Sequence, residues 1–241
     1  MNRIRISLFA VSSLIYLVTL SPACAQKQAK GTQKTAFLTC WDEKTKKYAS
    51  RSVHGAVLAS PDGSQQAYVK VDAQALGKDS SGQEGCQNRS ALLIARGAKD
   101  HFDSVFSYQG EKEEKGNGIQ LIDWSPDSKV LVADLLTWYY FSEGWEHNII
   151  VYSTQTGTVQ KKSLEALFSA ALHKDCGLEA RLMGFLRDGR VAVMARPLDE
   201  EEGPSCVKKD SIWAIDTSNF KVSALTKPEE IKQNGKFRKD D

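Results

Sequence analysis

The residues best suited to binding chemistry lie between positions 137 and 148, in the stretch TWYYFSEGWEHN. The candidate ligand- or partner-binding side chains in it are Trp138, Tyr140, Trp145 and His147. Alternate residues of an extended strand share a face, so Trp138 and Tyr140 would point the same way. Aromatic rings bury a large area at little entropic cost, which suits a saccharide, peptide or protein partner. The alternative is that these rings pack inside the core.

No recognisable catalytic motif accompanies the aromatic stretch. The histidines, His54, His101, His147 and His173, are scattered, and the sequence has no G-x-S-x-G, H-E-x-x-H or phosphate-binding glycine loop. Acids of distant strands could still meet near a central channel, and the candidates are Asp72, Asp134 and Asp199. We therefore expect a non-catalytic binding or protein-interaction module without a cofactor. A hydrolase or lyase acting on extracellular saccharides or peptides is the alternative.

Four cysteines follow the N-terminal segment: Cys40, Cys86, Cys176 and Cys206. An even number of cysteines in an exported chain favours two disulfides. The chain has no C-x-x-C spacing, so no metal site is expected, although zinc is the competing interpretation.

The first 25 residues have the pattern of a signal peptide. Arg3 and Arg5 precede an apolar stretch at 8–20, and the small residues Ala23 and Ala25 follow it. We expect cleavage after Ala25 and a secreted or periplasmic protein. An uncleaved anchor and a lipid attached at Cys24 are the weaker alternatives. No later stretch approaches the roughly 20 apolar residues of a membrane span.

Charge and composition narrow the range of partners. Without residues 1–25 the chain keeps 30 of its 32 basic residues and all 30 acidic ones. A net charge near zero argues against nucleic acid as the partner. Residues 227–241 are charged and lack an apolar pattern, which predicts a disordered tail.

Three stretches share one turn signal. They are VLASPDGSQQAYV at 57–69, IDWSPDSKVLVADL at 122–135 and MGFLRDGRVAVMA at 183–195. Proline presets φ, the aspartate carboxylate accepts from nearby amides, and glycine adopts the left-handed corner. Apolar residues precede each turn and alternate after it, so each stretch predicts a β-hairpin.

A second kind of hairpin recurs between the first kind, at 36–50, 91–108, 148–163 and 211–225. Together the two kinds predict an all-β, β-propeller-like array of about three and a half four-stranded antiparallel blades. The half blade is 36–50, and the full blades are about 53–108, 117–162 and 178–225, within a domain at 26–226. One short helix, with Ser163 as its N-cap and Gly177 as its stop, should connect the last two blades.

The segment from Ile119 to Lys162 resembles the TolB-type β-propeller repeat, a WD-repeat-like unit with an SPDG turn. Ser125, Pro126 and Asp127 match its turn, and residues 154–157 match its last turn. The resemblance implies a propeller, a fold that hosts many unrelated functions. Closed propellers usually have four to eight blades. We therefore expect ring closure, a homo-oligomer, or completion of a larger propeller by another chain.

The blade order also ranks the three possible cysteine pairings. Cys176 precedes the first strand of the blade in which Cys206 precedes the third strand, so these two cysteines should form a local bridge. Cys40 and Cys86 then form the second disulfide.

Overall fold

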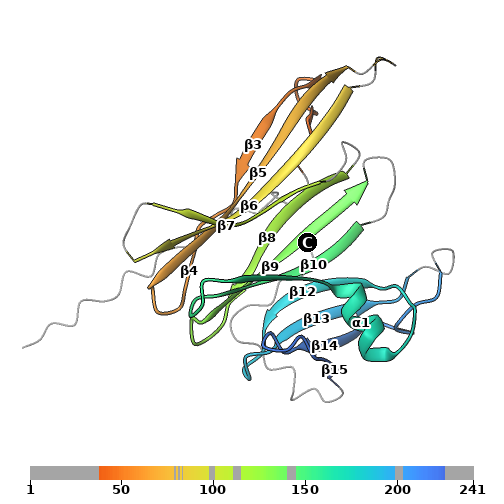
Figure 1. The fold of residues 1–241 in the computed structure, drawn as a ribbon. Coiled ribbons are helices and arrows are strands. Elements are labelled where there is room, and N and C mark those ends of the chain that lie inside the picture. The colour runs from red at the N-terminus through yellow and green to blue at the C-terminus, as the bar shows by residue number, and fades with distance from the viewer. Residues whose placement is uncertain are drawn as a thin grey trace, which may run out of the picture. The chain divides into compact units, whose positions relative to one another are not determined.

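The computed structural model describes residues 38–78, 80, 82, 84–97, 101–110, 115–139, 145–198 and 203–225. The signal peptide predicted at 1–25 and the tail predicted at 227–241 lie outside these residues. The described part consists mostly of β-strands in antiparallel sheets, with one α-helix (Figure 1). The all-β prediction is thereby confirmed at the level of secondary structure.

Three sheets follow one another along the chain. The first contains β3 (Arg51–His54), β4 (Leu58–Ala59), β5 (Gln65–Lys78), β6 (Glu84–Arg96) and β7 (Asp103–Gln109). The second contains β8 (Lys115–Trp124), β9 (Val130–Tyr139), β10 (Trp145–Ser153) and β11 (Val159–Ser163). The third contains β12 (Glu179–Phe185), β13 (Val191–Arg196), β14 (Ser211–Ile215) and β15 (Val222–Ala224). The second and third sheets pair their strands in chain order. In the first sheet, both β3 and β4 pair with the same edge of β5.

The three predicted turns join β4 to β5, β8 to β9, and β12 to β13, and they share their local geometry. In each, the residue in the left-handed conformation donates its N–H to the carbonyl three residues earlier, at 2.9–3.0 Å. These residues are Gly63, Ser128 and Gly189, with φ of 71°, 60° and 85°. In each, the turn aspartate also accepts from the amide two residues later. The third turn is one residue shorter than the other two, because its closing hydrogen bond joins Leu186 and Arg190, four residues apart instead of five.

The second kind of hairpin repeats a different turn. A residue in the left-handed conformation donates its N–H to the carbonyl four residues earlier, at 2.7–2.8 Å. The residues that do so are Lys46, Gly157 and Phe220. The turn at Lys46 belongs to the N-terminal hairpin of β1 (Trp41–Asp42) and β2 (Lys47–Tyr48). The hairpin near the N-terminus therefore has the same turn as those that end the second and third sheets.

Strand β9 packs against both other sheets, so the second sheet lies between the first and the third. Its alternate residues Leu131 and Ala133 pack with Leu92 of the first sheet. Val132, on the opposite face, packs with Leu182 of the third sheet. Both faces are therefore buried, and this accounts for the nearly continuous apolar run VLVADLL at 130–136.

Hydrogen bonds reinforce the contact between the first and second sheets beside their turns. The Trp124 indole N–H donates to the Leu58 carbonyl at 3.1 Å, and the Asp62 amide donates to Ser128 Oγ at 3.1 Å. A tryptophan buried at such a position needs a partner for its N–H, and Leu58 supplies it. The repeated turns of the two sheets thus lie against each other.

The helix α1 (Leu164–Leu172) begins directly after β11, as expected from the sequence. Ser163 caps it by accepting from the Ala166 amide at 3.2 Å. Phe168 is buried on its inner side and meets Trp213 edge to face, with ring centroids 5.2 Å apart. The helix ends before Gly177, because His173 adopts the left-handed conformation (φ 52°) and closes the last turn.

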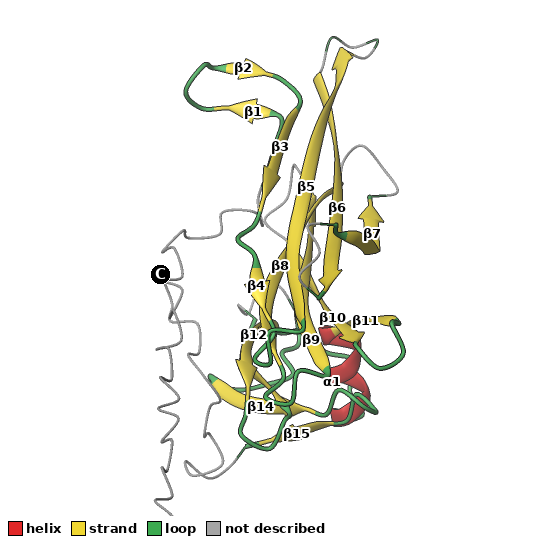
Figure 2. Ribbon diagram, turned by 90° about the vertical axis from the view of Figure 1, so that its left-hand side faces the viewer, coloured by secondary structure: helices red, strands yellow, loops and turns green. Residues whose placement is uncertain are grey.

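The N-terminal hairpin does not extend any of the three sheets, and it pairs only with itself among the described strands. Leu38 and Cys40 pack on Val71 and Ala73 of β5, beside Cys86 of β6. Figure 2 shows the hairpin beside the long strands β5 and β6. A short two-stranded hairpin has little stability of its own, so this packing and a covalent link hold it.

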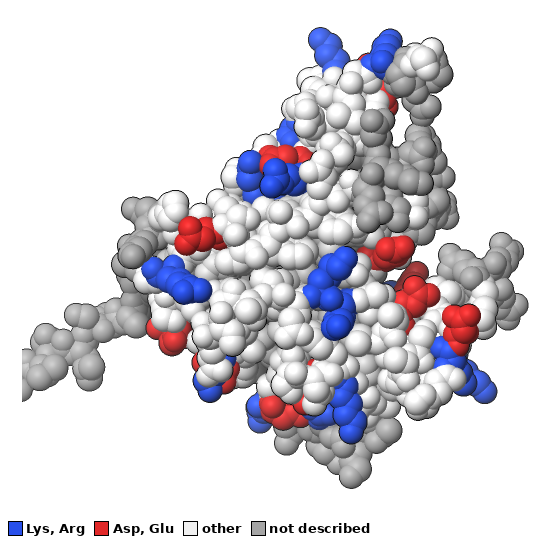
Figure 3. Space-filling model, viewed as in Figure 1, with Lys and Arg blue, Asp and Glu red and all other residues white. Residues whose placement is uncertain are grey.

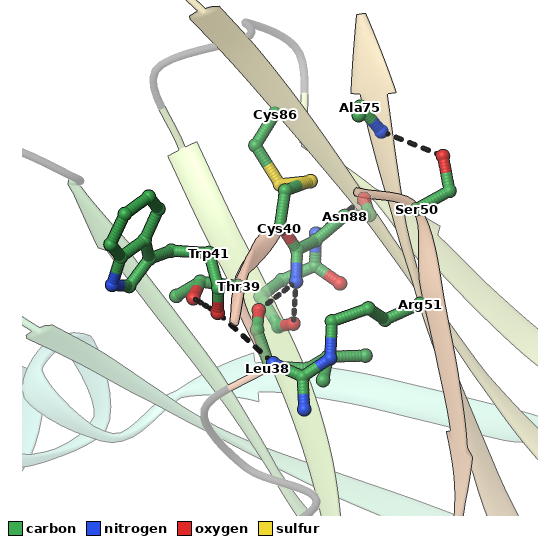
Figure 4. The surroundings of a disulfide bond; sticks show 10 residues. Leu38, Thr39, Cys40, Trp41, Ser50, Arg51, Ala75, Cys86 and Asn88 are labelled. Atoms are coloured by element: carbon green, nitrogen blue, oxygen red, sulfur yellow. Dashed lines mark hydrogen bonds between the residues drawn. A yellow bond between two sulfur atoms is a disulfide. The ribbon is translucent and has the colours of Figure 1, made fainter. Parts of the chain in front are cut away.

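Two disulfides form, and they are the pairs ranked first from the sequence. Cys40 bonds to Cys86 with an S–S distance of 2.04 Å, and Figure 4 shows the bond beside Leu38 and Asn88. Cys176 bonds to Cys206 at 2.07 Å. Disulfides persist in oxidising compartments, so the pair of bonds favours a protein that functions outside a reducing cytoplasm.

Candidate functional site

The aromatic stretch divides into a buried tryptophan and exposed rings. Trp138 is only 7% exposed and lies against Gly116 of the neighbouring strand β8. A Cβ at position 116 would sit 2.2 Å from the Trp138 ring, so only glycine allows this approach. The burial of Trp138 therefore favours a role in core packing over ligand binding. Tyr140 lies outside the described residues.

Trp145 is the more exposed of the two tryptophans of this stretch. It is 55% exposed and lies directly opposite Trp138 in the antiparallel pair of β10 and β9. Paired residues share a face, so Trp145 continues the row that Gly116 and Trp138 begin. Tyr139 is 43% exposed but belongs to the other face of β9, because neighbouring residues alternate. One large exposed ring therefore marks the face that turns toward the third sheet.

His147 lies on the same face as Trp145, two residues further along β10. Its Nδ1 is 2.8 Å from Oδ2 of Asp134, a carboxylate of β9 that is 3% exposed. Burial lowers the pKa of His147, but the hydrogen bond from Asp134 and the charges of Asp134 and Glu179 outweigh it, so the pKa is raised. The carboxylate also fixes the ring, because Nδ1–H donates to it and Nε2 is left as the acceptor nitrogen.

One oxygen of Asp134 has no hydrogen-bond donor among the described residues. Oδ1 is buried and accepts no hydrogen bond from any described residue. Buried carboxylate oxygens nearly always have a donor, so this atom calls for one that the described residues do not supply. It is the strongest sign in the described residues that something polar binds beside His147.

Glu146, between Trp145 and His147, does not contribute to this face. It alternates with Trp145 and His147, and its Oε2 accepts from Thr137 Oγ1 at 3.2 Å on the opposite side of the sheet. The charge of Glu179, at the start of β12, also acts on His147.

The three acids proposed to meet near a channel are not brought together. Asp72 lies on β5, accepts from Ser52 Oγ at 2.6 Å and pairs with Lys70 at 2.9 Å. Its neighbours Val71 and Ala73 face the N-terminal hairpin, so the Asp72 side chain takes the other face of the first sheet. Asp134 belongs to the second sheet, and Asp199 lies outside the described residues.

A buried amide network between the first and second sheets could not be foreseen from the sequence. Asn117 Nδ2 donates to the Asn88 carbonyl at 2.8 Å, and its Oδ1 accepts from Ser90 Oγ at 2.7 Å. Asn88 Nδ2 donates to the Leu38 carbonyl at 2.6 Å. All three side chains are fully buried, so the Asn88-Arg89-Ser90 sequence is structural and does not present a glycosylation acceptor.

The face of the molecule seen in Figure 3 carries no large patch of one charge sign. Figure 3 shows basic and acidic side chains interspersed among uncharged ones on the face viewed. Within the described ranges, no group of three or more His, Cys, Asp or Glu side chains is placed to hold a metal ion. Nor does this part of the chain contain a helix long and apolar enough to cross a membrane.

The arrangement offers one exposed indole, one oriented imidazole and the charges of two carboxylates, Asp134 on β9 and Glu179 on β12. It can accept hydrogen bonds and attract positive charge. Comparison with known proteins adds no further constraint: no protein-family model matches the chain, and no curated protein matches it.

Proposed function

We propose that the chain is an exported, non-catalytic binding or protein-interaction module that recognises its ligand with the surface formed by Trp145 and His147. The observation that carries this proposal is the contrast between two adjacent tryptophans. Trp138 is buried against Gly116, whereas Trp145 stays largely exposed beside a histidine that a buried carboxylate orients. Large exposed rings of this kind are enriched where partners bind.

The proposal includes a TolB-like propeller arrangement of the three sheets. It is supported by the repeated turn, the chain-order pairing of strands and the burial of both faces of the second sheet. A secreted or periplasmic location is part of the same proposal and is supported by the two disulfides. Cleavage after Ala25 stays a prediction from the sequence.

The proposal is tested with arrays of saccharides and peptides probed by the mature protein and two variants. Trp145→Ala removes the exposed ring of the site, and Trp41→Ala removes an exposed ring of the N-terminal hairpin as a matched control. Binding by the wild type and by Trp41→Ala, lost in Trp145→Ala at an unchanged melting temperature, supports the proposal. Equal binding by all three proteins contradicts it.

A hydrolase or lyase is the second candidate, and the pairing of His147 with Asp134 favours it. A histidine held by a buried carboxylate is a common general base. Robust turnover of saccharide or peptide substrates that disappears in His147→Gln would replace the binding proposal with this one.

Completion of a larger ring by a second copy or another polypeptide is the structural alternative. Three sheets and a hairpin are fewer than the four to eight blades of closed propellers. Light scattering tests self-completion, since a mass above one chain supports it and the mass of one chain removes it.

A further inference from the structure

The face around His147 gathers acceptor groups from three strands of two sheets. Asp134 comes from β9, His147 from β10 and Glu179 from the start of β12. Asp134 Oδ2 is engaged by the imidazole, and Oδ1 is buried without a donor among the described residues. The site therefore has more acceptors than donors.

Electrostatics at this position favour a positive charge. Burial alone would lower the pKa of His147, yet Asp134 and Glu179 raise it, so the surroundings stabilise a cation at the ring. The charged groups that act on the ring are Asp134 from β9 and Glu179 from β12. A proton on His147 is one such cation, and a ligand cation beside the ring would feel the same field.

Trp145 adds an aromatic surface next to this field. Along a strand, residues two apart on one face are separated by about 7 Å. The exposed indole of Trp145 thus lies within the span of a small ligand that also reaches His147. Indole faces attract ammonium and guanidinium groups more strongly than any other side-chain ring does.

We propose that Trp145, His147, Asp134 and Glu179 bind a ligand through a cationic group, an ammonium or a guanidinium. This inference rests on the proposed function and names the chemistry of its ligand. The cation lies against the Trp145 indole and donates to His147 Nε2. The charge of Glu179 attracts it, and Asp134 holds the imidazole in the orientation that receives it. The neutral imidazole is the binding form, so a bound cation displaces the proton from His147.

Calorimetric titration of the mature protein with three probes tests the inference. They are n-butylammonium, a capped Gly-Lys-Gly peptide, and the same peptide acetylated on its lysine. We expect the charged probes to bind and the acetylated peptide not to bind. Binding of both charged probes points to the ammonium alone, and binding of the peptide only points to a polypeptide ligand.

Variants and pH make the test specific for the site. Glu179→Gln should weaken binding about two- to fivefold, the range for an exposed charge pair. Trp145→Leu should weaken it by a similar factor, from the lost cation–π contact. Glu43→Gln on the N-terminal hairpin is the matched control and should change nothing. Affinity should rise as pH increases through the pKa of His147, with proton release seen as a dependence of the binding heat on the buffer.

Three outcomes would overturn the inference: equal binding of the acetylated peptide, no effect of either site variant, or no dependence on pH. If saccharides bind at Trp145 while all cations fail, the cation inference falls and the proposed function stands. If neither saccharides nor peptides bind in a Trp145-dependent way, both fall.

Discussion

Replacement of Asn117 by alanine should lower the free energy of unfolding more than any exposed substitution of the same size. The amide of Asn117 lies at the junction of β8 and β6, where it donates to the Asn88 carbonyl and accepts from Ser90. All three residues are fully buried. Deletion of the amide removes one hydrogen bond from the Asn88 carbonyl and one from Ser90 Oγ.

The expected loss follows from these two groups. A buried donor or acceptor that loses its partner costs about 1–3 kcal/mol, so Asn117→Ala should cost about 2–6 kcal/mol. Ser90→Ala removes only one of the two bonds and should cost about 1–3 kcal/mol. Because the two residues share a hydrogen bond, the double variant should cost less than the sum of the single ones.

Urea unfolding of the oxidised protein, followed by circular dichroism, gives these free energies. Gln74→Ala is the matched control, since it removes an exposed amide from β5 and should change stability by less than about 0.5 kcal/mol. If Asn117→Ala is as mild as Gln74→Ala, or if Ser90 and Asn117 act additively, the first and second sheets are not joined through this network.

Three further predictions follow from other parts of the chain. Replacing both Cys40 and Cys86 by alanine should lower the free energy of unfolding by about 4 kcal/mol, and replacing Cys176 and Cys206 should lower it by about 3.6 kcal/mol. The difference arises because the first disulfide closes a loop of 46 residues and the second a loop of 30. Denaturant unfolding measures both losses, and the opposite order would contradict the loop-entropy argument. Hydrogen bonds from Ser60 and Ser64 lower the pKa of Asp62 to about 2, which NMR titration should detect. The stability that ionised Asp62 contributes should be complete above pH 3.8, the ordinary pKa, and should be lost as pH falls through about 2. An ordinary pKa would show that the turn does not form as described. Because the pKa of His147 is raised, its stabilising contribution is complete at acidic pH and is lost as pH rises through the folded value. Wild type should therefore exceed His147→Gln in stability by more at pH 5.5 than at pH 8.5, and a difference independent of pH would contradict the pairing with Asp134.

The turns and strands were predictable from the sequence because their signals are local. Pro61, Asp62 and Gly63 specify a corner whose conformation and hydrogen bonds are set within a few residues. The run at 130–136 is apolar at nearly every position, which fits a strand covered on both faces. The order of the cysteines along the predicted strands sufficed to rank the two disulfides.

The candidate site could not be predicted, because it depends on the register between paired strands, which the sequence does not reveal. Asp134 meets His147 only because Trp138 pairs with Trp145, and a slip of one residue would put the two side chains on opposite faces. The burial of Trp138 depends in the same way on Gly116 of a third strand. The end of the helix was placed too late, because a non-glycine residue, His173, takes the left-handed capping conformation.

Contact between the repeated turns of neighbouring sheets is tested most directly by a NOESY spectrum of the folded, oxidised protein. The Trp124 indole N–H, which donates to the Leu58 carbonyl across the junction of β8 and β4, should show cross-peaks to protons of Leu58 and Ala59 and should exchange slowly with solvent. A rapidly exchanging indole proton with no cross-peak to β4 would contradict the contact between the first and second sheets, and with it the proposed propeller-like arrangement.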